Sequence, residues 1–215
     1  HLMAEVIRSE KLKVKDRFII FRTWHPANIS AILKGKIEKV AQQIADAFGI
    51  KDAPMLIQML SDGDDVFVIE FSARTGGGVK HLSIERRTGV DIVSAVIDLT
   101  LGEKPHIVPR EPLTRYMVDE YIYCKPGVYD HVEGFDDMIK SGVITDYYIF
   151  RWKESIFDTV ENSGDRIGGF TIQGDSIEEL RDKHNLVNRT VKVMSMTNKD
   201  IMHHDLLADF NDQEA

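Results

Sequence analysis

The chain has 215 residues, which is enough for one large domain or two small ones with a real hydrophobic core. Hydrophobic residues make up 43% and charged residues 29% of the sequence, as in soluble globular proteins. The formal net charge of −8 argues against nucleic acid or an anionic membrane as the main partner, because both favour basic patches.

The single cysteine, Cys124, excludes an internal disulfide and suits a reducing cytoplasm. The sequence contains no apolar run of transmembrane length and no visible signal peptide. We interpret His1-Leu2-Met3 as a remnant of cloning ahead of the native chain and leave it out of the argument.

The N-terminal region predicts a strand at Arg17–Arg22, where the sequence becomes apolar. Alternating lysines over Lys11–Lys15 precede it and indicate a strand with a solvated face; a phosphate contact is the alternative. Pro26 ends this pattern. We expect His25 to be a loop histidine, with a position near a substrate as the alternative.

A helix is predicted from Ser30 to Phe48, because apolar residues recur there at three- and four-residue spacing. Gly49 stands at the position where a helix commonly ends in left-handed conformation. Two apolar runs then flank a polar, acidic turn between Met55 and Gly78, the pattern of an antiparallel hairpin.

The hairpin carries the candidate site. With Ser61–Asp65 as its loop, Leu60 would pair with Val66 and Gln58 with Val68. Strand alternation then places Gln58 on the same face as three residues of the second strand, namely Glu70, Ser72 and Arg74.

Three glycines, Gly76, Gly77 and Gly78, follow this polar face. A carboxylate and a neutral oxygen can hold Mg²⁺, which fills its remaining positions with water and phosphate. Glycine amides and the guanidinium of Arg74 can approach an oxyanion. The sequence thus favours a site for metal and phosphate, although many such hairpins are purely structural.

The segment after the glycines predicts a helix from Val90 to Leu101, ended by Gly102 and Pro105. We expect Lys80 and His81 to be solvated loop residues, with contact to a substrate as the alternative. The prolines between Lys104 and Thr114 mark the best candidate boundary between domains.

The second half predicts alternating strands and helices around further turns. Helices are expected at Phe135–Lys140 and from Ser176, which opens a capping box with Glu179. A last short helix is expected from Met202. Strands are expected at Tyr116–Cys124, Val143–Trp152 and Ile167–Gln173, with turns at Lys125–Gly127 and Glu161–Asp165.

Two further patterns are discounted. The run Gly164–Gly168 lacks the lysine and the following helix of a P-loop, so it is read as a turn. The histidines His184, His203 and His204 lack partners at ligand spacing, and no zinc site is assigned.

The run from Val68 to Gly78 resembles the metal-binding core of ATP-grasp ligases, in the branch of L-amino acid ligases and other carboxylate–amine ligases. The second strand of that core usually carries Glu-x-Asn and then an arginine. The resemblance implies that Glu70 bridges Mg²⁺ to ATP and that Gln58 is the upstream ligand, a position held by glutamate in biotin carboxylases and glutamine in carbamoyl phosphate synthetases. Ser72 departs from the usual asparagine and is a weaker ligand.

The same resemblance implies that Arg74 and the Gly76–Gly77 turn hold the acyl-phosphate intermediate, and that Gly76, Gly77 and Gly78 bind the cofactor. The implied fold class is α+β: the C-terminal half of an ATP-grasp domain over residues 4–112, followed by a small α+β C-terminal ligase domain over residues 113–215. The implied cofactors are ATP and Mg²⁺, with Mn²⁺ able to replace it.

The resemblance covers nearly all of this chain but about half or less of a whole family member. We therefore expect a C-terminal fragment, or one half of a split enzyme, that is inactive alone and needs the N-terminal ATP-grasp half. Its substrates would be a small-molecule carboxylate and an amine, and a homodimer would cover the apolar patch left exposed. A carbamoyl phosphate synthetase-like or biotin carboxylase-like protein, or a non-catalytic binding or assembly module, stays open.

Overall fold

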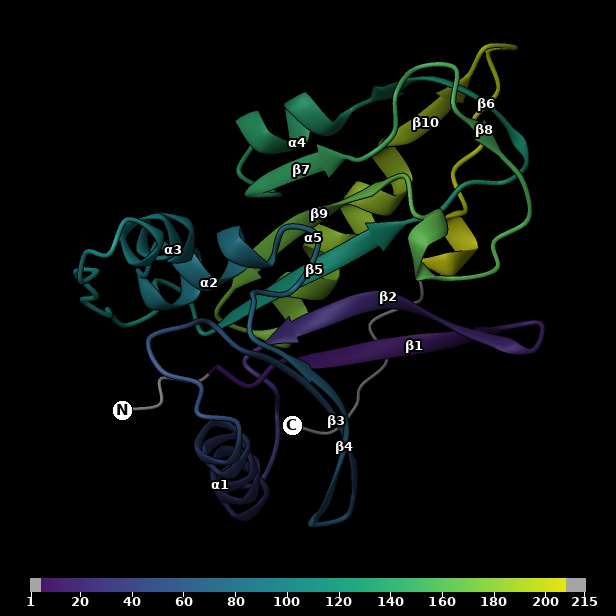
Figure 1. The fold of residues 1–215 in the computed structure, drawn as a ribbon. Helices are drawn as coiled ribbons and strands as arrows, with labels where there is room; N and C mark the ends of the chain where they lie inside the picture. The colour runs from purple at the N-terminus through teal and green to yellow at the C-terminus, as the bar shows by residue number, and fades with distance from the viewer. Residues whose placement is uncertain (1–4, 208–215) are drawn as a thin grey trace. The chain divides into compact units, whose positions relative to one another are not determined.

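The computed structural model describes residues 5–207 and divides the chain into two compact units, which are taken separately here (Figure 1). One unit contains the segment ending at Val6 and residues Asn28–Leu113; the other contains Ile7–Ala27 and the chain from Thr114 onward. The interpreted cloning remnant, His1-Leu2-Met3, lies outside the described residues.

The predicted division at residues 4–112 and 113–215 stays a prediction, and the compact units differ from it in the placement of the N-terminal strands. Residues 7–27 belong to the second unit because the strand β2 (Arg17–His25) pairs with β5 (Tyr116–Ile122). A pairing between segments so far apart in sequence leaves no local signal in either of them.

The first unit contains one hairpin and three helices. Its elements are α1 (Ala31–Ala47), β3 (Leu56–Asp62), β4 (Asp65–Ser72), α2 (Lys80–Thr88) and α3 (Ile92–Thr100). The predicted first helix is confirmed: the Ser30 hydroxyl accepts a hydrogen bond from the backbone N–H of Leu33, and Gly49 has a φ of 62° just beyond the end.

The helix α2 was not expected from the sequence. It follows the glycines directly, where Lys80 and His81 were expected in a loop. Its N-cap residue, Val79, makes no side-chain capping hydrogen bond, so the usual start signal is missing. The predicted helix from Val90 begins two residues later as α3, because the Asp91 carboxylate accepts hydrogen bonds from the amides of Val93 and Ser94.

The second unit is built on a five-stranded antiparallel sheet in the order β1-β2-β5-β9-β7 and a smaller sheet in the order β10-β6-β8. Two short 3-10 helices lie at Ser163–Asp165 and His204–Leu206. Its other elements are β1 (Arg8–Val14), β6 (Gly127–Glu133), α4 (Phe135–Lys140), β7 (Asp146–Ile149), β8 (Ile156–Phe157), β9 (Gly168–Gly174), α5 (Ile177–Thr190) and β10 (Lys192–Ser195).

Most of the predicted elements of this unit are present, although their ends differ. The helix α4 has the predicted bounds, β5 and β9 lie within a residue or two of theirs, and β7 is shorter than Val143–Trp152. The strands β6, β8 and β10 were not predicted. The Ser176 hydroxyl caps α5 through the amide of Glu179, but the Glu179 carboxylate accepts from the amide of Asp175 and so leaves the predicted box half formed.

Buried charges link β2, β5 and α5 on one side of the main sheet. Glu120 is fully buried, and its Oε1 accepts from Arg22 Nε at 2.6 Å and lies 3.1 Å from His184 Nδ1. Arg22 also donates to Glu10 at 3.3 Å. Burial alone raises the pKa of Glu120, but Arg22 and His184 outweigh it and hold that pKa below its usual value.

The neighbouring residue on β5, Asp119, forms a second buried pair. Its carboxylate lies 3.1 Å from His25 Nε2 and accepts from the Thr171 hydroxyl at 3.0 Å. The expectation of a loop position for His25 is wrong, since this residue ends β2 and is almost completely buried. Adjacent strand residues point to opposite sides, so both sides of β5 carry an acid–histidine contact.

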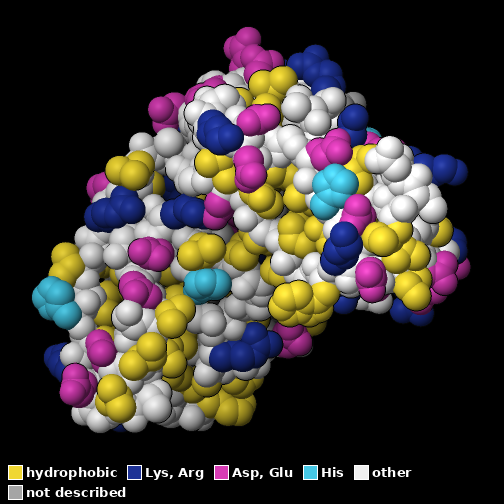
Figure 2. Space-filling view, turned by 90° about the horizontal axis from the view of Figure 1, so that it is seen from above, with side chains coloured by type: hydrophobic (Ala, Val, Ile, Leu, Met, Phe, Trp, Pro, Cys, Tyr) yellow, Lys and Arg dark blue, Asp and Glu magenta, His cyan; other side chains and the backbone are white. Residues whose placement is uncertain are grey.

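Charged side chains of both signs lie among hydrophobic ones on the face shown in Figure 2. None of the helices within residues 5–207 has the length and hydropathy needed to cross a membrane.

Removing Arg22 should strongly destabilise the second unit. Arg22→Met leaves the Glu120 carboxylate buried without its main partner, which we expect to cost about 3–5 kcal/mol. Lys140→Met is the matched control, because the pair Lys140–Asp137 is exposed at 3.6 Å and should cost less than about 1 kcal/mol. Urea unfolding followed by tryptophan fluorescence measures both, since Trp24 and Trp152 lie in this unit.

The stabilisation from Glu120 should also depend on pH. Its pKa is lowered in the folded state from the ordinary value of 4.5, so the contribution is fully present above that pH. It is lost as the pH falls through the folded pKa. We therefore expect the stability difference between wild type and Arg22→Met to narrow below about pH 4.5; a constant difference down to pH 3 contradicts this view of the buried pair.

Candidate functional site

The hairpin β3–β4 holds the predicted site residues in a register that differs from the expected one. Its turn consists of only Gly63 and Asp64, with Asp62 opposite Asp65 and Gly63 at a φ of 56°. Leu60 therefore pairs with Phe67 and not with Val66. The expected five-residue loop is wrong because a glycine with positive φ permits a two-residue turn.

A register irregularity in the hairpin changes the residue that pairs with Gln58. Pairing shifts between Gln58 and Met59, and Ile69 of the facing strand has no partner. Gln58 consequently pairs directly with Glu70, whereas Val68 was expected. Directly opposite residues of an antiparallel pair share a face, so the predicted grouping of these two side chains is kept by a different route.

The two faces of the hairpin have different surroundings. On one face the ring of Phe71 lies 4.7 Å from the ring of Phe48, at the end of α1. The other face, here called the open face, consists of alternating positions on the two strands. The open face includes Leu56, Gln58, Leu60, Phe67, Glu70 and Ser72.

The open face is exposed and partly apolar. Leu60 and Phe67 each keep 56% of their accessible surface, and Glu70 is also exposed. Gln58 and Ser72 are half-buried. A cation can therefore reach the Glu70 carboxylate from solvent.

The glycine loop leads from β4 into α2. Arg74 is exposed, and its Nη1 donates to the carbonyl of Thr75 at 2.8 Å. Gly78 has a φ of 71°, a left-handed conformation that favours glycine and turns the chain into the helix. The two other glycines of the loop, Gly76 and Gly77, have ordinary φ values, so their lack of a side chain matters only for space.

These side chains suit a hard cation that needs only a few ligands from the protein. One carboxylate (Glu70), one amide oxygen (Gln58) and one hydroxyl (Ser72) lie on the same face, and Mg²⁺ commonly takes one or two carboxylates with water and phosphate completing its shell. Within residues 5–207, no group of three His, Cys, Asp or Glu side chains could hold a metal. A metal here would therefore depend on these three oxygen donors.

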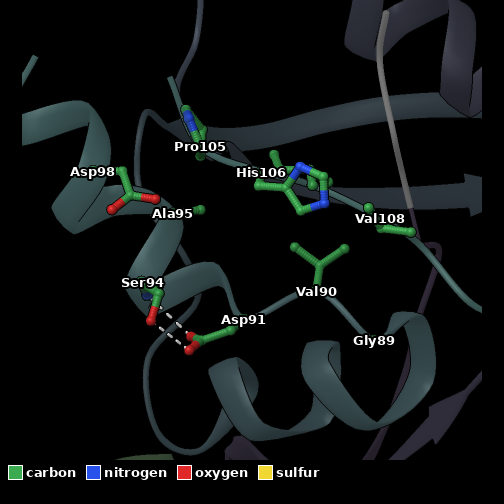
Figure 3. A pocket seen from close by; sticks show the side chains of 10 residues that line it. Gly89, Val90, Asp91, Ser94, Ala95, Asp98, Pro105, His106 and Val108 are labelled. Atoms are coloured by element: carbon green, nitrogen blue, oxygen red, sulfur yellow. Dashed lines mark hydrogen bonds between the residues drawn. The ribbon is translucent and has the colours of Figure 1, made fainter. Parts of the chain in front are cut away.

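A separate pocket of about 490 Å³ lies in the same unit between α3 and the segment 105–108 (Figure 3). The carboxylate of Asp91 is held by the Ser94 hydroxyl and amide, which lower its pKa. The other lining residues are Gly89, Val90, Ala95, Asp98, Pro105, His106, Ile107 and Val108. The lining contains none of the predicted site residues, so the pocket does not coincide with the hairpin site.

The contact between Phe71 and Phe48 should hold the hairpin against α1. Phe71→Ala removes the half-buried ring, and we expect it to destabilise β3 and β4 by about 2 kcal/mol. Phe67→Ala changes the same residue type on the open face and should cost less than about 0.5 kcal/mol. Amide hydrogen exchange of the two strands measures both variants, and equal effects contradict the assignment of faces.

No protein-family model and no curated protein sequence matches the chain. Solved structures do match. Phosphoribosylglycinamide synthetase from Anaerococcus prevotii superposes with a TM-score of 0.75 at 15% identity, covering 90% of this chain and 50% of that one. L-amino acid ligase from Bacillus licheniformis superposes with a TM-score of 0.71 at 18% identity, covering 84% and 45%.

A third match is the biotin carboxylase domain of a 2-oxoglutarate carboxylase from Hydrogenobacter thermophilus, in complex with MgADP, ADP and bicarbonate. Its TM-score is 0.59 at 15% identity, and the match covers 87% of this chain and 41% of that one. The chain thus spans about half or less of the length of these structures.

These matches show that the chain shares its fold with part of each of these solved structures. The resemblance seen in the sequence is confirmed at the level of fold, and so is the mixed architecture with antiparallel sheets. The predicted assignment of the two units to the C-terminal half of an ATP-grasp domain and an additional small domain stays a prediction.

Proposed function

We propose that this chain carries the metal- and acyl-phosphate-binding part of an ATP-dependent carboxylate–amine ligase. The observation that carries the proposal is the direct pairing of Gln58 with Glu70, beside Ser72 and the glycine loop, in a chain with the fold of such ligases. The matched biotin carboxylase domain is in complex with MgADP, which supports ATP and Mg²⁺ as cofactors.

We assign each polar residue of the open face a role in metal binding that follows from its side-chain chemistry. Glu70 is the main metal ligand, Gln58 contributes an amide oxygen, and Ser72 offers a weaker hydroxyl. These residues would hold Mg²⁺ or Mn²⁺, which would supply positive charge to neutralise and orient the phosphates. Arg74 and the amides of the loop stabilise the negative charge on the group being transferred.

The proposed reaction has two steps. A carboxylate oxygen of the substrate bonds to the γ-phosphorus of ATP as ADP leaves, which gives an acyl phosphate. An amine then attacks the acyl carbon, inorganic phosphate leaves, and the amine gives up a proton as the amide bond forms. We assign no residue of this chain to binding adenine or to selecting the carboxylate and the amine.

The branch of carboxylate–amine ligases is favoured over the alternatives. The superpositions on phosphoribosylglycinamide synthetase and L-amino acid ligase have TM-scores of 0.75 and 0.71, against 0.59 for the biotin carboxylase domain. Gln58 still leaves a carbamoyl phosphate synthetase-like protein as an alternative. The shorter hydroxyl of Ser72 favours the remaining alternative, a non-catalytic binding module, because it is a poor substitute for the usual asparagine.

Metal binding at Glu70 tests the proposal. Titration of the chain with Mn²⁺, followed by electron paramagnetic resonance, should show one weak site that Glu70→Gln weakens about tenfold or more. Asp65→Asn removes the same charge from the tip of the same hairpin and should leave the affinity unchanged within about twofold. Equal loss in both variants would mean that Mn²⁺ responds to general acidity and not to a site at Glu70.

We also expect that the chain alone does not turn over ATP. Holding ATP in an enclosed site can lower the reaction barrier by about 7–11 kcal/mol. In this chain, Glu70 lies on an exposed surface where solvent and salt screen its charge. An ATP turnover assay with Mg²⁺ and mixed amino acids, with Glu70→Ala as control, measures this. Turnover by the chain that depends on Glu70 would contradict the expectation.

A further inference from the structure

Gly76 has a specific spatial reason to be glycine. A Cβ at this position would lie 3.1 Å from Lys80 Cγ and 3.4 Å from Lys80 Cβ. The same Cβ would lie 3.7 Å from Leu56 Cδ1. The aliphatic stem of Lys80 therefore runs across the bare side of Gly76, and a methyl group there would force that stem to move by a few tenths of an ångström.

The neighbouring glycine has no such restriction. A Cβ at Gly77 would have no heavy atom within 4 Å, and its φ is ordinary. The glycine loop thus offers one position where a side chain would displace Lys80 and an adjacent position where it would not.

The contact places Lys80 at the open face of the hairpin. Leu56, whose methyl group approaches the same point, pairs with Ser72 and shares its face with Gln58 and Glu70. Lys80 begins α2, so its backbone is fixed by the helix, and its side chain is half-buried. Its ammonium lies three bonds beyond the Cγ that covers Gly76, and is a compact point charge on a flexible stem.

Two cations consequently flank the glycine loop. Arg74 precedes it and Lys80 follows it, while the first turn of α2 contains no acidic residue. A carboxylate or phosphate group at the loop amides would thus have one cationic residue before the loop and one after it in the chain. Cations that converge on one anion form the shorter, stronger class of hydrogen bond.

We propose that Lys80, together with Arg74, binds the anionic oxygens of the group held at the glycine loop, and that Gly76 leaves room for the Lys80 stem to cross the loop. This inference rests on the proposed function and adds a second anion-binding residue to it. The ligand chemistry is a carboxylate or phosphate oxygen, from the acid substrate or from the transferred phosphoryl group.

Anion titrations of the chain with Mg²⁺ present test the proposal. Inorganic pyrophosphate, followed by ³¹P NMR, represents the phosphoryl source, and acetate, followed by ¹³C NMR, represents the carboxylate source. Lys80→Met should weaken binding of at least one probe by about tenfold, and Lys80→Arg should stay within about threefold of wild type. Lys36→Met is the matched control, because Lys36 contacts the far end of the hairpin through the carbonyl of Asp64.

The glycine pair gives a second and independent test. Gly76→Ala should weaken the same probe by about fivefold through displacement of Lys80, and Gly77→Ala, whose added methyl group meets no neighbouring atom, should weaken it less. Added NaCl should reduce the difference between wild type and Lys80→Met, because screening weakens a charge contact and leaves a purely structural effect in place.

The outcomes separate the two claims. Equal affinity in wild type and Lys80→Met, or equal loss in Gly76→Ala and Gly77→Ala, overturns the role of Lys80 and leaves the proposed function standing. Absence of binding of both probes to the wild-type chain overturns both. If Lys80→Met fails to fold, Lys80→Arg and the two glycine variants decide the question.

Discussion

The pairing of Gln58 with Glu70 is the constraint on which the candidate site depends. It requires the two-residue turn at Gly63 and the unpartnered Ile69, because either feature alone would place Gln58 opposite another residue. The contact between Phe71 and the end of α1 then fixes which face is covered. Local backbone geometry and one aromatic contact thus present the carboxylate, amide and hydroxyl together on the open face.

The second unit depends on buried acidic residues that pair with histidines. Its main sheet buries Asp119 and Glu120 side by side on β5, and each finds a histidine on its own side. Such pairs contribute little net stability over a hydrophobic core, but removing one partner is costly. On the β2 side, Arg22 contacts Glu120 and His25 contacts Asp119, where the N-terminal hairpin joins a sheet formed mainly by the C-terminal half.

Sequence reasoning succeeded where the signal is local. The periodicity and cap of α1, the bounds of α4 and the existence of the β3–β4 hairpin followed from spacing and turn residues. It failed where the decisive contact is distant or unsignalled, as in the pairing of β2 with β5 and the burial of His25. The helix α2 was missed because Val79 gives no cap, and Lys80 was consequently read as a loop residue although its stem crosses Gly76.

The most direct test of the central claim is the position of a bound metal on the hairpin. Mn²⁺ added at low ratio to isotope-labelled chain broadens amide signals near it. The account predicts the strongest broadening at Gln58, Glu70 and Ser72, with the glycine-loop amides next. Broadening centred on the acidic turn Asp62–Asp65, with these signals unaffected, would contradict it.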